Sequence, residues 1–170
     1  MAQKTKKWEE WLSLVGETAK VVSYADYFSC RPLFSSLQVK NAGEEGIEGL
    51  TLTVTNENGM LIPCEKQLED IPFESAVEIA LGNILSPLYF SNIEEVKTER
   101  LEVTLRKEKR VLARAEFTVT ALPFDFWQGV NGNAEQLAAF VRPRLADCAK
   151  LQKEVIEQLK KWGAEAEIGG

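Results

Sequence analysis

Histidine, cysteine and carboxylate side chains carry much of protein catalysis, and this sequence offers few useful combinations of them. Histidine is absent, which excludes Ser–His and Cys–His nucleophile pairs and every zinc site that uses histidine. Cys30, Cys64 and Cys148 are odd in number and widely spaced, without a Cys-x-x-Cys pair. We expect them to be reduced thiols that pack as small apolar side chains. The chemistry that remains is that of carboxylates, a lysine nucleophile or a hard metal ion.

Carboxylate pairs occur at Glu44-Glu45 and at Glu94-Glu95. Acid–base catalysis needs pKa values shifted by burial, and neighbouring acids in polar segments are typical of solvated loops. The oxygen-rich D-x-D-x-D-G spacing of a calcium loop does not occur. The sequence therefore predicts a protein that is not an enzyme, with no catalytic residue, no cofactor and no metal site. An unrecognised carboxylate site is the remaining route to catalysis.

Basic residues are densest in the run Arg106–Arg110, and a second basic pair flanks Pro143. They could contact phosphate, or they could lie at a solvated surface. Residues 21–127 carry a net charge of −7, which disfavours nucleic-acid binding through that region, because phosphate contacts need clustered lysine and arginine. The candidate phosphate contacts are Lys107, Lys109, Arg110, Arg142 and Arg144.

Large aromatic side chains provide the candidate partner-binding residues, and they fall into two groups. Each group either fills a seam inside the protein or docks on a partner. The residues are Trp8 and Trp11 near the N-terminus, and Phe124, Phe126 and Trp127 further along.

Apolar and polar residues alternate with a period of two through much of the chain from residue 21 onward. Such alternation predicts antiparallel strands with one buried face and one solvent-exposed face. In residues 111–121 the odd positions from Val111 to Ala121 form the predicted buried face. The other clear strands are 33–40, 50–55, 77–81 and 101–106; 21–28 and 61–68 are further candidates, the second at an edge because of Pro63.

Several short strands separated by Asn- and Gly-rich turns predict a mainly β fold with flanking helices, an antiparallel immunoglobulin-like or fibronectin-like β-sandwich. Residues 107–109 are expected at the tip of a hairpin between two strands. We divide the chain into an N-terminal amphipathic helix within residues 1–20, a sandwich at 21–127, C-terminal helices packed on the sandwich at 128–163, and a flexible tail at 164–170.

The predicted flanking helices rest on apolar residues at helical spacing. Trp8, Trp11, Leu12 and Val15 share one face of a helix over residues 4–18. A short helix follows Asn133, and Pro143 should end it. A second helix over 144–162 has a seam with three- and four-residue spacing, whose members are Leu145, Cys148, Gln152, Val155, Leu159 and Trp162. No apolar run approaches the roughly 18 residues of a membrane helix, so we expect a cytoplasmic protein without membrane contact.

Residues 121–143 contain two distinctive runs, A-L-P-F-D-F-W at 121–127 and E-Q-L-A-A-F-V-x-P at 135–143, with Gly129 between them. With these runs the segment resembles part of large bacterial helicase-related proteins of uncharacterised function. In that family the first run closes an N-terminal β-sandwich and the second forms a helix. This chain departs from the family after Pro143, where Arg144 replaces the usual asparagine. The resemblance covers residues 20–160 and implies an N-terminal β-sandwich, with which the alternating strands of residues 33–122 are compatible. It carries no catalytic residue with it.

These observations favour a non-catalytic scaffolding or protein-interaction module, as a domain of a helicase-like multidomain protein or a relative of one. The partner would be a protein or a downstream domain of the same system. The alternative is a nucleic-acid-binding accessory domain of a helicase-like machine. The oligomeric state is not determined by the sequence.

Overall fold

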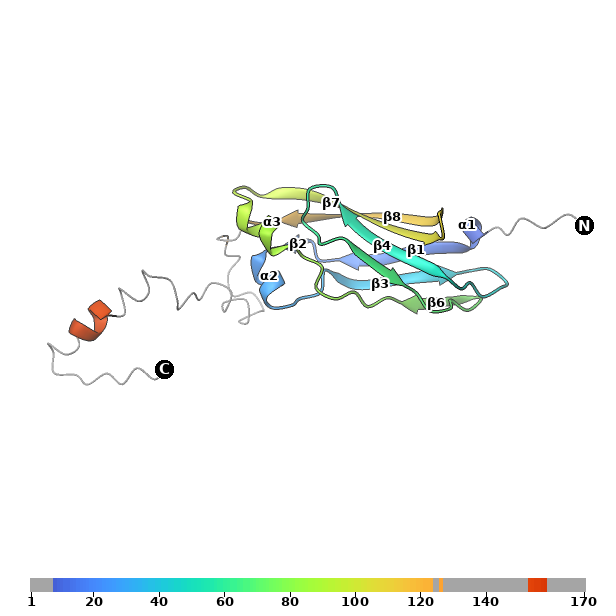
Figure 1. Cartoon of the computed structure of the whole chain (residues 1–170), viewed down its shortest axis with the longest axis horizontal. Helices are drawn as coiled ribbons and strands as arrows, with labels where there is room; N and C mark the ends of the chain where they lie inside the picture. Colours follow the sequence, from blue (N-terminus) through green and yellow to red (C-terminus); the bar gives the residue numbers. More distant parts are fainter. Residues whose placement is uncertain (1–7, 124–125, 127–152, 159–170) are drawn as a thin grey trace, which may run out of the picture.

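A computed structural model describes residues 8–123, 126 and 153–158 of the 170-residue chain. The described strands form two sheets that face each other (Figure 1). The first has the order β1-β3-β6, with β1 at Leu12–Thr18, β3 at Phe34–Asn41 and β6 at Ser75–Glu78. The second has the order β2-β8-β7-β4-β5, with β2 at Val21–Val22, β8 at Arg110–Ala121, β7 at Lys97–Lys107, β4 at Leu50–Asn56 and β5 at Cys64–Gln67.

Three short helices lie at the two ends of this sandwich (Figure 1). Helix α1, Trp8–Trp11, lies at one end, beside the tip of the β7–β8 hairpin. Helices α2, Tyr24–Phe28, and α3, Pro87–Asn92, lie side by side at the opposite end. Neighbouring strands pair antiparallel, except that the two residues of β2 pair parallel with the end of β8.

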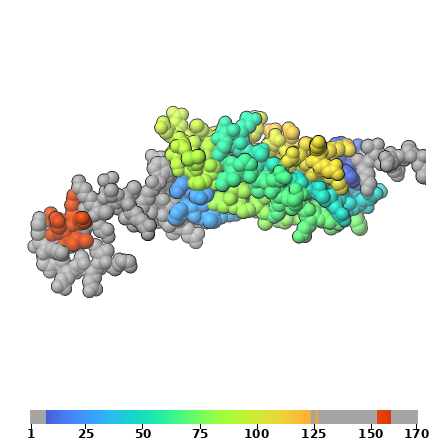
Figure 2. Space-filling view, viewed as in Figure 1, coloured from blue at the N-terminus to red at the C-terminus, as the bar shows by residue number. Residues whose placement is uncertain are grey.

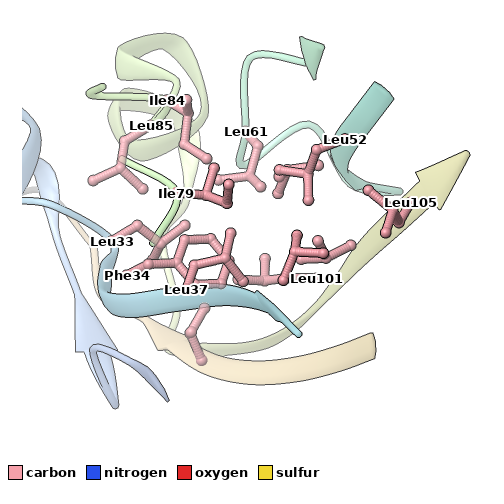
Figure 3. Close-up of a cluster of buried hydrophobic side chains, with 14 of the residues drawn as sticks. Leu33, Phe34, Leu37, Leu52, Leu61, Ile79, Ile84, Leu85, Leu101 and Leu105 are labelled. Carbon is pink, nitrogen blue, oxygen red and sulfur yellow. The ribbon is translucent and has the colours of Figure 1, made fainter. Parts of the chain in front are cut away.

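The core lies between the sheets, where leucine and isoleucine side chains from both layers meet (Figure 3). Leu37 projects from β3 toward Leu52 and Leu101 of the opposite sheet, and all three are fully buried. Burying one such side chain contributes roughly 2 kcal/mol, so this layer is the main source of stability. The predictions of a mainly β protein with two sheets, and of inward-facing Leu50, Leu52 and Val54, are confirmed.

The predicted helix over residues 4–18 is wrong after Trp11, because residues 12–18 form strand β1. Trp8–Trp11 are helical, and residues 4–7 lie outside the described residues. Leu12 is buried and Leu14 is partly buried, whereas Val15 is exposed. Trp8, Trp11, Leu12 and Val15 happen to follow helical spacing, but residues 12–18 gain a full ladder of hydrogen bonds with β3. Tertiary pairing therefore overrides the periodic signal.

The predicted strand over residues 21–28 is wrong after Val22, because the chain turns into helix α2. The buried carboxylate of Asp26 accepts hydrogen bonds from the backbone N–H of Ser23, at 2.8 Å, and from its hydroxyl, at 3.0 Å. This Ser-x-x-Asp arrangement satisfies donors at the helix start that a strand would have paired with a neighbour.

A β-bulge changes which residues of β8 point inward. The β7–β8 register shifts between Leu105 and Arg106, so that Leu105 faces Ala113 while Arg106 faces Val111. Leu112 is the extra residue of the bulge and is buried, whereas Val111 is exposed. The prediction that Val111 lies on the buried face is therefore wrong, although Val119 and Ala121 on the same face are buried as expected.

The edge position predicted for residues 61–68 is confirmed, since β5 is the last strand of its sheet and follows Pro63. Residues 107–110 form the predicted hairpin turn, with Glu108 at a left-handed φ of 52°. The predicted C-terminal helices of 128–163 and the tail of 164–170 fall outside the described residues, apart from 153–158, which are helical. No helix in the described ranges has the length and hydropathy that crossing a membrane requires.

Candidate interaction surfaces

The two N-terminal tryptophans pack against their own domain. The ammonium group of Lys107 lies 4.5 Å from the centre of the Trp8 ring, a cation–π contact at the tip of the β7–β8 hairpin. The Trp11 ring covers Gly43, and the Trp11 carbonyl accepts a 2.9 Å hydrogen bond from Ala42. Both tryptophans are half-buried, so their contacts within the chain account for much of their apolar area.

Much of the charge on the basic hairpin is engaged within the chain. The Arg110 side chain donates a 2.7 Å hydrogen bond to Glu9, and this bond lowers the pKa of the Glu9 carboxyl. Lys107 lies on Trp8, while Lys109 is exposed at the turn. Three candidate phosphate contacts, Lys107, Lys109 and Arg110, thus lie on one hairpin. Lys107 and Arg110 already have partners within the chain. Arg142 and Arg144 lie outside the described residues.

Of the second aromatic group, Phe126 is exposed, and Phe124 and Trp127 lie outside the described residues. The carboxylate pairs at 44–45 and 94–95 lie at opposite ends of the sandwich and are exposed, as expected of solvated loops. Cys30 and Cys64 are free thiols. Cys30, which follows α2 and has a left-handed φ of 54°, is exposed, so the expectation that it packs as a small apolar side chain is wrong.

A buried carboxylate, Glu99, accepts three hydrogen bonds from side chains of other elements, although nothing in the sequence marks it as a special residue. Glu99 lies near the start of β7 and is 1% exposed. Its Oε1 accepts a 2.6 Å hydrogen bond from the Tyr89 hydroxyl of α3. Its Oε2 accepts bonds of 2.9 Å from the side-chain amides of Asn56 and Asn58.

Desolvation on burial raises the pKa of Glu99, but the hydrogen bonds from Tyr89, Asn56 and Asn58, together with the charge of Lys97, outweigh it and lower the pKa overall. Burial, followed by the hydrogen bond to Glu99, raises the pKa of Tyr89. The lowered pKa favours the ionised form of Glu99, whose two oxygens accept these hydrogen bonds. Glu99 ties α3 and the turn after β4 to the start of β7.

Two hollows lie on the outer face of the five-stranded sheet, over β4, β7 and β8. The first has a volume of about 360 Å³ and the second about 230 Å³. They share Thr55 and Glu102 as lining residues, so together they form one groove, the β4–β7–β8 groove. Asn56, Glu57, Asn58, Arg100 and Glu116 complete the first hollow, and Thr53, Thr104, Arg106, Val111 and Arg114 complete the second.

The charged residues along this groove form long, exposed ion pairs. Glu102 and Glu116 face each other across β7 and β8, an unfavourable pairing of like charges. Arg114 lies 3.6 Å from Glu102, and Arg100 lies 3.8 Å from Glu116. Exposed pairs of this kind stabilise a protein by at most about 1 kcal/mol, so exchanging them for contacts with another molecule costs little.

The alternation of β4 already indicates that Thr53 and Thr55 face outward, but not that this face is hollow. The hollows depend on which residues lie side by side on β4, β7 and β8, and local periodicity carries no such information. The same holds for Glu99, whose partners lie 10 to 43 residues away in the sequence.

No protein-family model and no curated protein matches this chain. The resemblance of residues 121–143 to helicase-related proteins therefore stays a prediction. In the part of the chain that the structure describes, no group of three or more Cys, Asp or Glu side chains is arranged to hold a metal ion.

Proposed function

We propose that this chain is a protein-interaction module on an immunoglobulin-like sandwich, and that it binds an extended polypeptide segment in the β4–β7–β8 groove. The strand order supports the fold type. Strands β1, β3 and β6 correspond to A, B and E of that fold, and β4, β7 and β8 to C, F and G. Strand β5 then extends the second sheet beside C, where the variable-type domain has its extra strands.

The single observation that carries the function is the groove itself. Between Arg106 and Arg100 it follows β7 for about 20 Å, at roughly 3.3 Å per residue, which is the length of an extended segment of about six residues. Its charged side chains include both signs, and its threonine hydroxyls both donate and accept hydrogen bonds. A mixed-charge polypeptide satisfies such a lining better than a nucleic-acid backbone, which needs clustered positive charge.

The place of the module in a cell is a separate proposal. The resemblance of residues 121–143 supports a role beside a helicase-like machine, in the cytoplasm of a bacterium, with a protein partner or a downstream domain. The engagement of Lys107 and Arg110 by Trp8 and Glu9 favours the protein partner over nucleic acid.

Charge reversal along the groove tests the function. The double variant Arg100→Glu, Arg114→Glu should lose the proteins that the wild-type chain recovers from a cell extract, as quantified by mass spectrometry. The matched control is Lys20→Glu, Lys40→Glu, which makes the same change in charge at exposed sites outside the groove. Both variants should melt cooperatively. If the groove variant recovers the same proteins as the wild type, the groove is not the binding site.

A further inference from the structure

Exposed apolar side chains concentrate at the end of the sandwich that carries α2 and α3. Nine large apolar residues are exposed in the described chain, and five of them lie at this end. We call this surface the α2–α3 end (Figure 2). It comprises Phe28 of α2, Ile62 after β4, Leu88 of α3, Val96 before β7 and Phe126 after β8.

Helix α3 shows the contrast within one element. Phe90 faces the core and is fully buried, whereas Leu88 is 72% exposed. Phe28, the last residue of α2, is 53% exposed. The packing between α2 and α3 and the 2.7 Å hydrogen bond from Asn83 to the Tyr27 carbonyl hold these elements together. Soluble proteins rarely gather exposed apolar residues on one surface, so this end is a candidate docking surface.

The chain leaves the sandwich at this same end (Figure 1). The Leu122 amide donates a 2.9 Å hydrogen bond to the Val22 carbonyl, and the Phe126 amide donates a 3.1 Å bond to the Pro123 carbonyl. Phe126 thus belongs to the α2–α3 end and is also the residue from which the C-terminal 44 residues continue.

We propose that residues 133–144 of the same chain occupy the α2–α3 end. Leu137, Phe140 and Val141 provide an apolar stripe at i, i+3 and i+4. Arg142 and Arg144 follow directly and complement Glu94 and Glu95, the exposed acids between α3 and β7. Neither the acidic pair nor the basic pair lines the β4–β7–β8 groove.

The length of the tether favours this occupant over a second copy or another protein. Only six residues separate Phe126 from residue 133, so residue 133 lies at most about 25 Å from Phe126 even when the chain between them is fully extended. A short tether keeps a segment at an effective concentration of about a millimolar beside its site. The segment therefore outcompetes free partners of similar affinity. The α2–α3 end shares no residue with the β4–β7–β8 groove.

Amide hydrogen exchange, measured on the full chain, tests the proposal with variants in which the charges of the acidic and basic pairs are reversed. In the wild type, amides of residues 133–144 should exchange at least about tenfold more slowly than an unprotected chain. Glu94→Lys, Glu95→Lys should lose that protection, as should Arg142→Glu, Arg144→Glu. Combining all four substitutions should restore it. The control Glu44→Lys, Glu48→Lys places the same charge change at the opposite end and should leave protection intact.

Amides of β7 and β8, followed in the same experiment, report whether each variant keeps the sandwich. Unprotected exchange of 133–144 in the wild type overturns the proposal, as does equal loss of protection in the Glu44, Glu48 control. Failure of the fourfold variant to regain protection while β7 and β8 stay protected also overturns it. Protection that rises with protein concentration would assign the surface to a second copy instead.

Discussion

The hydroxyl of Tyr89 donates a 2.6 Å hydrogen bond to Oε1 of Glu99 and so joins α3 to the beginning of β7. The other carboxylate oxygen of Glu99 accepts hydrogen bonds from the side chains of Asn56 and Asn58, and the side-chain Oδ1 of Asn56 in turn accepts a 2.8 Å bond from the Met60 backbone N–H. One buried acid thereby organises three segments at the end of the sandwich where the first hollow of the groove begins.

Glu99→Gln should lower the free energy of unfolding by about 1–3 kcal/mol, the cost of leaving a buried polar group without its partner. The substituted amide presents N–H donors to a position where Asn56 and Asn58 already donate. Chemical denaturation at neutral pH measures this loss. Glu116→Gln, at an exposed position of β8, is the control and should change stability by less than about 0.5 kcal/mol.

The same carboxylate should make stability depend on pH. Because the pKa of Glu99 is lower in the folded protein than the ordinary 4.5 of a glutamate, protonation favours the unfolded chain. Its contribution is therefore complete above pH 4.5 and decreases as the pH falls through the lower, folded-state pKa. Glu99→Gln should make the melting temperature fall less steeply with decreasing pH, in melting experiments between pH 3 and 7. If the variant loses stability at low pH as steeply as the wild type, Glu99 is not the group responsible.

Gly43 should not tolerate a side chain, because the Trp11 ring lies where its Cβ would be. Gly43→Ala should displace the ring and destabilise the domain by about 1–3 kcal/mol, as overpacking does. A change in tryptophan fluorescence should accompany the loss. Gly82→Ala is the matched control, because a Cβ there meets open space. Equal stability of the two variants would show that Trp11 does not pack on Gly43.

The two layers of the fold could be predicted from the sequence because their signal is local. In β4, Leu50, Leu52 and Val54 alternate with Thr51, Thr53 and Thr55, and burial follows this alternation without a break. Each pleat turns successive side chains to opposite faces, so a run of such residues reports its own buried face.

The errors arise where distant residues decide the local structure. Residues 12–18 are a strand because β3 lies beside them, and their helical spacing with Trp8 and Trp11 is incidental. The sequence does contain the signal for α2, since Ser23 and Asp26 have capping-box spacing. The β4–β7–β8 groove has no such local signal, because its lining comes from three strands brought together by pairing.

The bulge in β8 provides the sharpest test of the structure against simple alternation. Alternation places Val111 in the core and Leu112 in solvent, whereas the structure leaves Val111 exposed and Leu112 only 4% exposed. Leu112→Ala should then cost about 2–5 kcal/mol, the usual range for a buried leucine. Val111→Ala should cost less than about 1 kcal/mol, because the side chain already contacts water. Urea unfolding of both variants gives the comparison directly. A larger loss for Val111→Ala than for Leu112→Ala would mean that β8 pairs with β7 without the bulge, and that Val111 does not line the groove.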